Sequence, residues 1–253
     1  MIRVIKKDPV NWTAADISSF WDWQSRSIIR QKQYFTALMA PGIVRYLKKN
    51  GLLKGNVLDY GCGAGHLLEQ MMKEKNVDLY GLDYSADSLF STKEKTGEAV
   101  KELVLIHDLP SPFSDAMFDT VTCVETIEHL QDGPLEDTMK EFYRITKPGG
   151  KIFITTPYNE DLELNLCFCP FCKSEFHQMQ HMQSFNVASL TKLAKRYKFE
   201  VQYCNNINIE VWRLGKFKFG LKRSLQSAAA SFGIAEKPVE TKDNLIAVLV
   251  KPL

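Results

Sequence analysis

Residues 56–65 carry the clearest structural signal in the chain and read Asn56-Val-Leu-Asp-Tyr-Gly-Cys-Gly-Ala-Gly65. The stretch begins as an apolar run typical of a β-strand, ends that run at Asp59, and continues as a loop with three glycines. The segment that follows, residues 66–73, is typical of a helix. Glycines in such a loop let the backbone turn tightly from strand into helix and let a ligand lie against bare main chain. We therefore predict a strand–loop–helix unit that binds a ligand through its loop.

A second apolar run, residues 78–83, ends in a carboxylate at the distance expected for nucleoside binding. Asp83 lies 18 residues after Gly65, where a nucleoside-binding βαβ unit places the acid that accepts the two ribose hydroxyls. A dinucleotide-binding domain would show Gly-x-Gly-x-x-Gly, whose third glycine lets a phosphate approach the helix N-terminus. The glycines here follow Gly-x-Gly-x-Gly, so the pattern disfavours a dinucleotide.

The composition is ordinary for a soluble globular protein, with 253 residues, 45% hydrophobic and 25% charged. This length suits a single domain with one buried core. A net charge of +2 gives no general support for binding nucleic acid. The sequence has no run of 18 apolar residues and no signal-peptide pattern, so we expect a cytoplasmic protein without a membrane span. In that compartment the six cysteines indicate free thiols or metal ligands rather than disulfides.

Apolar strands alternate with helices along most of the chain, a pattern that requires a parallel sheet with right-handed crossovers. Strands are predicted near 56–60, 78–83, 102–106, 118–124, 151–156, 199–204 and 244–250. Helix starts are predicted at a capping box formed by Thr13 and Asp16, at Pro41 and after Asn186. The aromatic-rich helical segment before residue 56 either covers a ligand cleft or forms core against the sheet.

Five segments, in order, resemble the motifs of the class I S-adenosylmethionine-dependent methyltransferases. They are 59–65, Asp83, 107–110, 118–125 and 147–157. The resemblance implies an α/β fold with a Rossmann-like, doubly wound, seven-stranded sheet whose last strand is antiparallel. We expect one domain in four parts: an N-terminal helical cap (1–52), a cofactor-binding core (53–157), a Cys/His-rich insertion (158–185) and a C-terminal part of the sheet (186–253) with a helical insertion (207–243). The insertion departs from the family, whose minimal members have no counterpart to residues 167–181.

The same resemblance implies S-adenosylmethionine as the cofactor. The residues that would bind it are Asp59, Gly61, Cys62, Gly63, Gly65, Asp83, Tyr84, Asp108, Leu109 and Glu125. Asp59 would orient the loop and the amino-acid end of the cofactor, Asp83 would accept the ribose hydroxyls, and Asp108 would face the adenine amino group.

Glu125, Glu128 and His129 are the candidate catalytic residues because they follow the fourth predicted strand, at the sheet edge where ligands bind. The pattern Glu-x-x-Glu-His resembles two branches of the family, the ubiquinone-pathway O-methyltransferases and the small-RNA 2′-O-methyltransferases. In those enzymes these residues and a distant histidine bind a divalent cation, and His181 stands near the place of that histidine. Carboxylates with imidazoles suit Mg, Mn or Zn. Two alternatives remain: His129 acts as a base without metal, or the group is purely structural.

A second cluster, Cys169, Cys172, His177 and His181, has the ligand types and spacing of a small zinc knuckle. Cys167 is a spare thiolate, and if His181 belongs to the cleft then Cys167, Cys169, Cys172 and His177 form the better set. The alternative is a buried cluster of reduced cysteines with core phenylalanines.

These observations predict a methyltransferase that uses S-adenosylmethionine to methylate a hydroxyl of a small or carrier-linked molecule, with or without help from a metal. Three alternatives stay open: an RNA 2′-O-methyltransferase, an N- or C-methyltransferase, and a catalytically inactive, zinc-stabilised binding module. Nucleic acid is a disfavoured partner because the chain has no broad basic tract. A basic, aromatic stretch, residues 216–223, either contacts an acidic or lipid-linked acceptor or forms a solvated helix face. The sequence makes no prediction of oligomeric state.

Overall fold

The computed structural model describes residues 8–9, 12–208 and 244–253, together with the single positions 211, 218, 222 and 224. Most of the predicted helical insertion 207–243 and of the basic stretch 216–223 lies outside the described residues. Within the described part, no helix is both long enough and apolar enough to cross a membrane.

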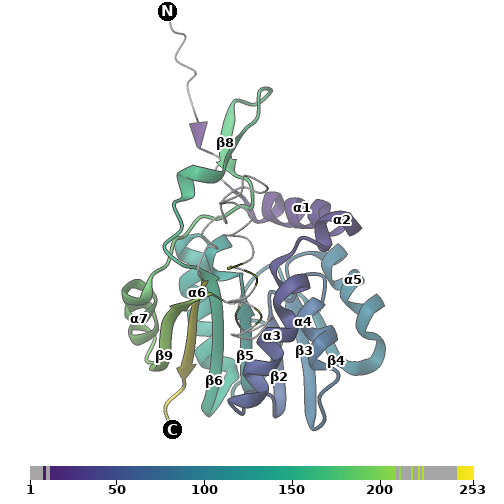
Figure 1. The fold of residues 1–253 in the computed structure, drawn as a ribbon, viewed down its shortest axis with the longest axis vertical. Helices are drawn as coiled ribbons and strands as arrows, with labels where there is room; N and C mark the ends of the chain where they lie inside the picture. The colour runs from purple at the N-terminus through teal and green to yellow at the C-terminus, as the bar shows by residue number, and fades with distance from the viewer. Residues whose placement is uncertain are drawn as a thin grey trace, which may run out of the picture.

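A seven-stranded sheet with the order β4-β3-β2-β5-β6-β10-β9 forms the centre of the fold (Figure 1). Its strands are β2 (Gly55–Tyr60), β3 (Val77–Asp83), β4 (Val100–Leu105), β5 (Phe118–Val124), β6 (Thr146–Pro157), β9 (Glu200–Ile207) and β10 (Asn244–Val250). The strands from β4 to β6 are parallel, whereas β10 runs antiparallel to both β6 and β9. This confirms the predicted Rossmann-like sheet with an antiparallel last strand.

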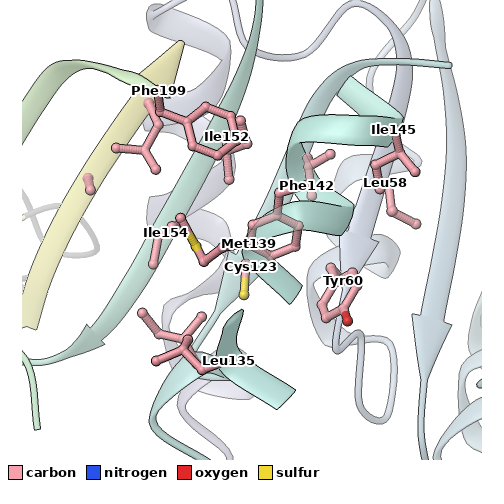
Figure 2. Packing of buried hydrophobic residues seen from close by; sticks show 14 of the residues in the cluster. Leu58, Tyr60, Cys123, Leu135, Met139, Phe142, Ile145, Ile152, Ile154 and Phe199 are labelled. Carbon is pink, nitrogen blue, oxygen red and sulfur yellow. The ribbon is translucent and has the colours of Figure 1, made fainter. Parts of the chain in front are cut away.

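Helices cover both faces of this sheet. One face packs against α3 (Phe35–Lys49), α4 (His66–Met71) and α5 (Ala86–Thr96). The other packs against α6 (Asp132–Ile145) and α7 (Val187–Arg196). Figure 2 shows Leu135, Met139 and Phe142 of α6 directed toward the strands, at the helical spacing that puts them on one side. The hydrophobic cores on the two faces of the sheet hold the strand ends in a fixed arrangement. The candidate site lies at these strand ends.

Two smaller parts complete the described fold. The helices α1 (Ala14–Ser25) and α2 (Ile28–Gln31) lie beyond the carboxyl ends of the strands, where α1 contacts α5 (Figure 1). A small sheet of order β1-β8-β7 consists of β1 (Asp8–Pro9), β7 (Leu166–Phe168) and β8 (Ser174–His177). The sequence pattern did not indicate this second sheet. Short 3-10 helices occur at η1 (Gly97–Ala99), η2 (Ile127–His129) and η3 (Leu162–Asn165).

The predicted helix starts can be compared with the structure one by one. Thr13 and Asp16 form the capping box of α1, and Asn186 caps α7, as predicted. The prediction that a helix starts at Pro41 is wrong, because Pro41 lies inside α3. A proline inside a helix loses one backbone hydrogen bond. The helix continues through it because its buried face packs against the sheet; that face comprises Ala40, Ile43, Val44 and Leu47.

Candidate active site

A cleft of about 700 Å³ opens at the carboxyl ends of β2, β3 and β5. The strand order reverses between β2 and β5, and this reversal is where open α/β sheets bind their ligands. The predicted site residues that line the cleft are Gly61, Cys62, Gly63, Asp83, Tyr84, Asp108, Glu125, His129 and His181. The fold therefore gathers residues from distant parts of the sequence at one edge of the sheet.

The glycine loop after β2 depends on its glycines for two different reasons. Gly61 has a φ of 74°, and a Cβ there would lie 2.5 Å from Thr126 Cγ2, so a side chain has no room. Gly63 has a φ of 52°, yet a Cβ there would meet nothing within 4 Å. The first glycine permits close packing on the loop after β5, whereas the second leaves bare backbone facing the cleft.

Asp83, the last residue of β3, ties this loop to the sheet. Its Oδ2 accepts a hydrogen bond from the Gly63 N–H at 2.7 Å, and its Oδ1 accepts one from the Ser85 N–H at 2.9 Å. Burial raises the pKa of the Asp83 carboxyl to about 6, although these backbone hydrogen bonds oppose the shift. The predicted ribose-binding acid therefore lines the cleft beside the glycine loop, poised between its charged and neutral forms.

Three predicted cofactor residues lie next to the cleft and not in its lining. Asp59 is 3% exposed beneath the loop and accepts a hydrogen bond from the Thr122 hydroxyl at 2.8 Å. Burial raises the pKa of Asp59 to about 7. Gly65 caps α4, and Leu109 packs half-buried against the core. These three residues therefore lie behind the residues that line the cleft and support them.

Helix α1 covers the cleft and brings Trp21 to it. The Ser25 and Ser88 hydroxyls are 2.7 Å apart, which docks α1 on α5. Trp21 lines the cleft and lies edge-on to His129, with ring centroids 4.8 Å apart. The aromatic N-terminal segment was expected either to cover the cleft or to form core against the sheet. The position of Trp21 agrees with the first interpretation.

The loop after β5 holds the candidate catalytic residues in a strained turn. Glu125 has a φ of 50°, which is unusual for a residue with a side chain. Its carboxylate accepts hydrogen bonds from the Thr155 hydroxyl at 2.7 Å and from Asn244 Nδ2 at 3.1 Å. Burial raises the pKa of Glu125 to about 7. Neighbouring strands of the sheet thus hold this side chain at the cleft.

Glu128 lies deeper, on η2, and only 1% of it is exposed. Neither oxygen of its carboxylate makes a well-formed hydrogen bond among the described residues, although the nearby Thr156 hydroxyl favours its charged form. Its backbone carbonyl accepts hydrogen bonds from Met182 N–H at 2.7 Å and Gln183 N–H at 3.0 Å, which fixes η2 against the segment after β8. Burial, reinforced by repulsion from Glu125, raises the pKa of Glu128 well above its usual range. A buried carboxylate without hydrogen bonds is costly, and such groups usually serve a function.

The neighbouring ring of His129 faces this carboxylate. Its Nδ1 is 3.4 Å from the Gln180 carbonyl oxygen, to which it donates, so that Nε2 keeps its lone pair. That Nε2 lies 4.0 Å from Glu128 Oε1. Burial lowers the pKa of His129 to about 3, with a further contribution from His181. His129 is therefore a neutral imidazole at physiological pH.

His181 completes a group of three. Its ring centroid is 4.8 Å from that of His129, and ligand atoms of Glu128, His129 and His181 all lie within 4.8 Å of one another. One carboxylate and two imidazoles suit Mn, Zn or a similar divalent cation. The residues fit a cation for a second reason: a buried carboxylate without a well-formed hydrogen bond lies 4.0 Å from the imidazole nitrogen that keeps its lone pair.

The predicted zinc knuckle of Cys169, Cys172, His177 and His181 is not assembled. Cys169 and Cys172 lie in the turn between β7 and β8, whereas His177 is buried at the far end of β8. Among the described residues, the groups of three candidate ligands that converge are Glu128–His129–His181 and Glu160–His177–His181, and neither contains a cysteine. Because the β-hairpin is extended, the cysteines at its tip lie far from His177 at its base. The spacing of these residues in the sequence does not reveal this separation.

The two alternatives for these cysteines also fail. The set that replaces His181 with Cys167 does not converge either, because Cys167 lies exposed on β7. A buried cluster is excluded because Cys167 and Cys172 are exposed and Phe171 is 94% exposed. Hydrogen bonds from Ser174, with a smaller contribution from Cys169, lower the pKa of the Cys172 thiol to about 7.

Two residues of the site, Glu160 and Gln180, were missing from the sequence predictions. Glu160 is buried beside His181, and Gln180 bonds to both Trp21 and His129. Of these, Glu160 had a usable signal, since it is a carboxylate just beyond the carboxyl end of β6.

Comparisons with known proteins agree with this fold. A family model described as a methyltransferase domain matches residues 30–203. The ubiquinone biosynthesis O-methyltransferases of Pectobacterium atrosepticum and of Vibrio cholerae are 32% and 35% identical to this chain, each over 112 residues, or 43% of it. The chain spans less than half the length of these curated relatives, 45% and 44% respectively.

A solved structure supports the fold independently. The DhpI–SAH complex matches with a TM-score of 0.64 at 14% identity, covering 94% of this chain and 97% of that one. An identity this low shows the fold alone. Together with the family match over more than half of the sequence, it shows that the chain belongs to the methyltransferase domain family, within the class I S-adenosylmethionine-dependent methyltransferases.

Proposed function

We propose that this protein transfers a methyl group from S-adenosylmethionine to a hydroxyl of a small or carrier-linked molecule, with a divalent cation held by Glu128, His129 and His181. The observation that carries the proposal is the buried, bare carboxylate of Glu128, 4.0 Å from the lone pair of His129 Nε2. The curated relatives are named as O-methyltransferases, which supports a hydroxyl as the acceptor.

Electrostatics favours a cation at this place. A carboxylate oxygen and an imidazole nitrogen that both accept hydrogen bonds repel each other unless a proton or a cation lies between them. Glu128 is 1% exposed, so water does not screen the contact well. Glu125 adds a second carboxylate at the cleft. Its negative charge strengthens the attraction of the site for a cation.

The chemistry divides between the cofactor, the cation and the chain. The cofactor supplies the activated methyl group, and a bound cation would lower the pKa of the acceptor hydroxyl. The chain contributes orientation: Gly63 leaves backbone open to the cofactor, and Asp83 faces its ribose. Trp21 and the apolar side chains of α1 and α3 wall the cleft and exclude water from the transfer.

The same geometry disfavours His129 as a metal-free base. A base acts best with a pKa near the working pH, and burial lowers that of His129 to about 3. A neutral imidazole with so low a pKa holds an abstracted proton weakly but remains a good metal ligand.

The experiment that tests this function is a methyl-transfer assay on matched acceptors. Labelled S-adenosylmethionine is offered with aromatic compounds that carry vicinal hydroxyls, one hydroxyl or an amine, before and after removal of metal by a chelator. We expect transfer to a hydroxyl, lost on chelation and restored by Mn or Mg. Transfer to the amine at an unchanged rate after chelation would contradict both the acceptor and the cation.

A further inference from the structure

We propose that Glu160 is a positioning residue that fixes the ring of His181, so that Nε2 is the nitrogen that faces the cleft. This inference rests on the proposed function and deepens it, because it names the group that prepares a ligand of the cation. No sequence motif identified Glu160, which lies in the loop after β6.

The contact between the two side chains is short and shielded from water. His181 Nδ1 lies 2.5 Å from Glu160 Oε2, and the Glu160 side chain is only 5% exposed. A carboxylate accepts, so Nδ1 of His181 must carry the proton and donate it to Glu160. The lone pair of the neutral ring is then on Nε2. Because His181 lines the cleft, this nitrogen is the one available to a ligand there.

The ring of His177 supports Glu160 from the other side. Its Nδ1 accepts hydrogen bonds from the backbone N–H of Met179 at 3.3 Å and of His181 at 3.2 Å. The proton of neutral His177 must therefore be on Nε2, which lies 3.7 Å from Glu160 Oε1. The ring also stacks on that of His181, with centroids 4.5 Å apart and planes 19° apart.

These hydrogen bonds decide between two functions for the group Glu160–His177–His181. As a second cation site it would need a lone pair on Nε2 of His177, but the two backbone donors at Nδ1 place the proton there. The group is therefore a support for His181 and not a second metal centre. Carboxylates that hold metal-binding histidines in this way commonly contribute tenfold to a hundredfold to metal affinity or activity.

The backbone around Glu160 keeps the carboxylate in place. Asn159 has a φ of 48°, and its N–H donates to the Phe185 carbonyl oxygen at 2.7 Å. The Ser184 hydroxyl donates to the Glu160 carbonyl oxygen, also at 2.7 Å. The loop after β6 is thus bonded to the segment that carries His181, so the pair does not depend on two flexible side chains alone.

The test has two readouts, of which the first needs no metal. Imidazole nitrogen chemical shifts from NMR report which ring nitrogen carries the proton. In the metal-free protein, at a pH where His181 is neutral, we expect the proton of His181 on Nδ1. In Glu160→Ala we expect a mixture of both tautomers or the Nε2–H form. An Nε2–H form in the unmodified protein, or an unchanged Nδ1–H form in Glu160→Ala, would overturn the proposal.

The second readout is the affinity for Mn²⁺ by calorimetry. Glu160→Ala should weaken binding by about tenfold to a hundredfold, and should have no further effect in a protein that already carries His181→Ala. Glu163 is an exposed acid three residues further on, in η3; Glu163→Gln is the matched control and should bind Mn²⁺ normally. Equal losses from Glu160→Ala with and without His181 would overturn the proposal. Absence of Mn²⁺ binding in the unmodified protein would refute the cation, while the NMR result would still decide the role of Glu160.

Discussion

The cleft at the strand ends and the turn of the β7–β8 hairpin both carry metal-ligand residue types, but among the described residues the cysteines of the turn do not converge with other candidate ligands. Glu128, His129 and His181 converge within 4.8 Å and are largely shielded from water. Cys169 and Cys172 lie in a turn beside Phe171, which is 94% exposed. Suitable residues at suitable spacing therefore make a site only where the fold buries them against one another.

The difference has a physical origin. In the cleft, the Glu128 side chain is 1% exposed and that of His129 is 12% exposed, so water solvates their lone pairs poorly. On the hairpin, water can solvate each exposed thiol separately. We therefore infer that burial, more than spacing, favours a cation.

The largest expected effect comes from replacing the bare carboxylate. Glu128→Gln keeps the shape of the side chain but removes its charge, so methyl transfer should fall by about a hundredfold or more, since a cation ligand is lost. Steady-state rates with saturating S-adenosylmethionine measure this. Cys172→Ser is the hairpin control and should retain the full rate. Equal losses of methyl-transfer rate in both variants would contradict the claim that the cleft and the hairpin differ in function.

Removal of Asp83, the proposed ribose-binding acid, should have the next largest effect. Asp83→Ala loses charge-assisted hydrogen bonds to the cofactor and should weaken its binding by about 2–3 kcal/mol. Calorimetry with S-adenosylhomocysteine gives the value. An unchanged affinity would contradict the assignment of Asp83, while leaving the cation site untouched.

Cofactor affinity should also depend on pH, because burial raises the pKa of Asp83 to about 6. The ribose hydroxyls need the charged carboxylate, so binding should weaken as pH falls through about 6, by about tenfold between pH 7 and pH 5. The sign for stability is opposite: the raised pKa lets the folded protein keep a proton that the unfolded chain has lost. Stability from this group therefore decreases as pH rises from about 4 to 6.

Calorimetric titrations at several pH values, with Asp83→Asn as the control, test this dependence. The Asn variant should bind weakly at every pH, with a flat profile over this range. An identical pH profile in both proteins would assign the dependence to another group, such as Asp59, whose pKa is raised to about 7.

A smaller effect, of opposite sign, is expected for stability. Without metal and at neutral pH, Glu128→Gln should raise the free energy of unfolding by about 1 kcal/mol. Burial raises the pKa of Glu128, so folding must either protonate this carboxyl or strip water from its charge, and the amide avoids both costs. Urea denaturation of the metal-free proteins measures the change. A clear loss of stability would mean that the carboxylate has a structural partner, which would weaken the case for a cation.

Much of the fold could be predicted from the sequence because its signals are local. The apolar runs, the glycine loop and the caps at Thr13 and Asn186 each depend on neighbours in the chain, and the structure confirms them. Pro41 did not follow its local preference, because tertiary burial of α3 outweighed it.

Topology made the site most predictable at the strand ends. Asp83 ends β3 and Glu125 follows β5, so the order of the strands places both at one edge of the sheet. The approach of Glu160 to His181 depends on hydrogen bonds between two loops, including Asn159 to Phe185, which no local pattern contains. The residues predicted as a zinc knuckle do not converge in this structure, for the related reason that spacing does not reveal which way a hairpin extends.

The measurement that tests the central claim most directly is a calorimetric Mn²⁺ titration of three metal-free proteins: the unmodified chain, Glu128→Gln and Cys172→Ser. The proposed site predicts about one bound ion per chain in the unmodified protein and in Cys172→Ser, and at least a hundredfold weaker binding in Glu128→Gln. Binding that persists in Glu128→Gln but disappears in Cys172→Ser would place the metal on the hairpin and contradict the claim.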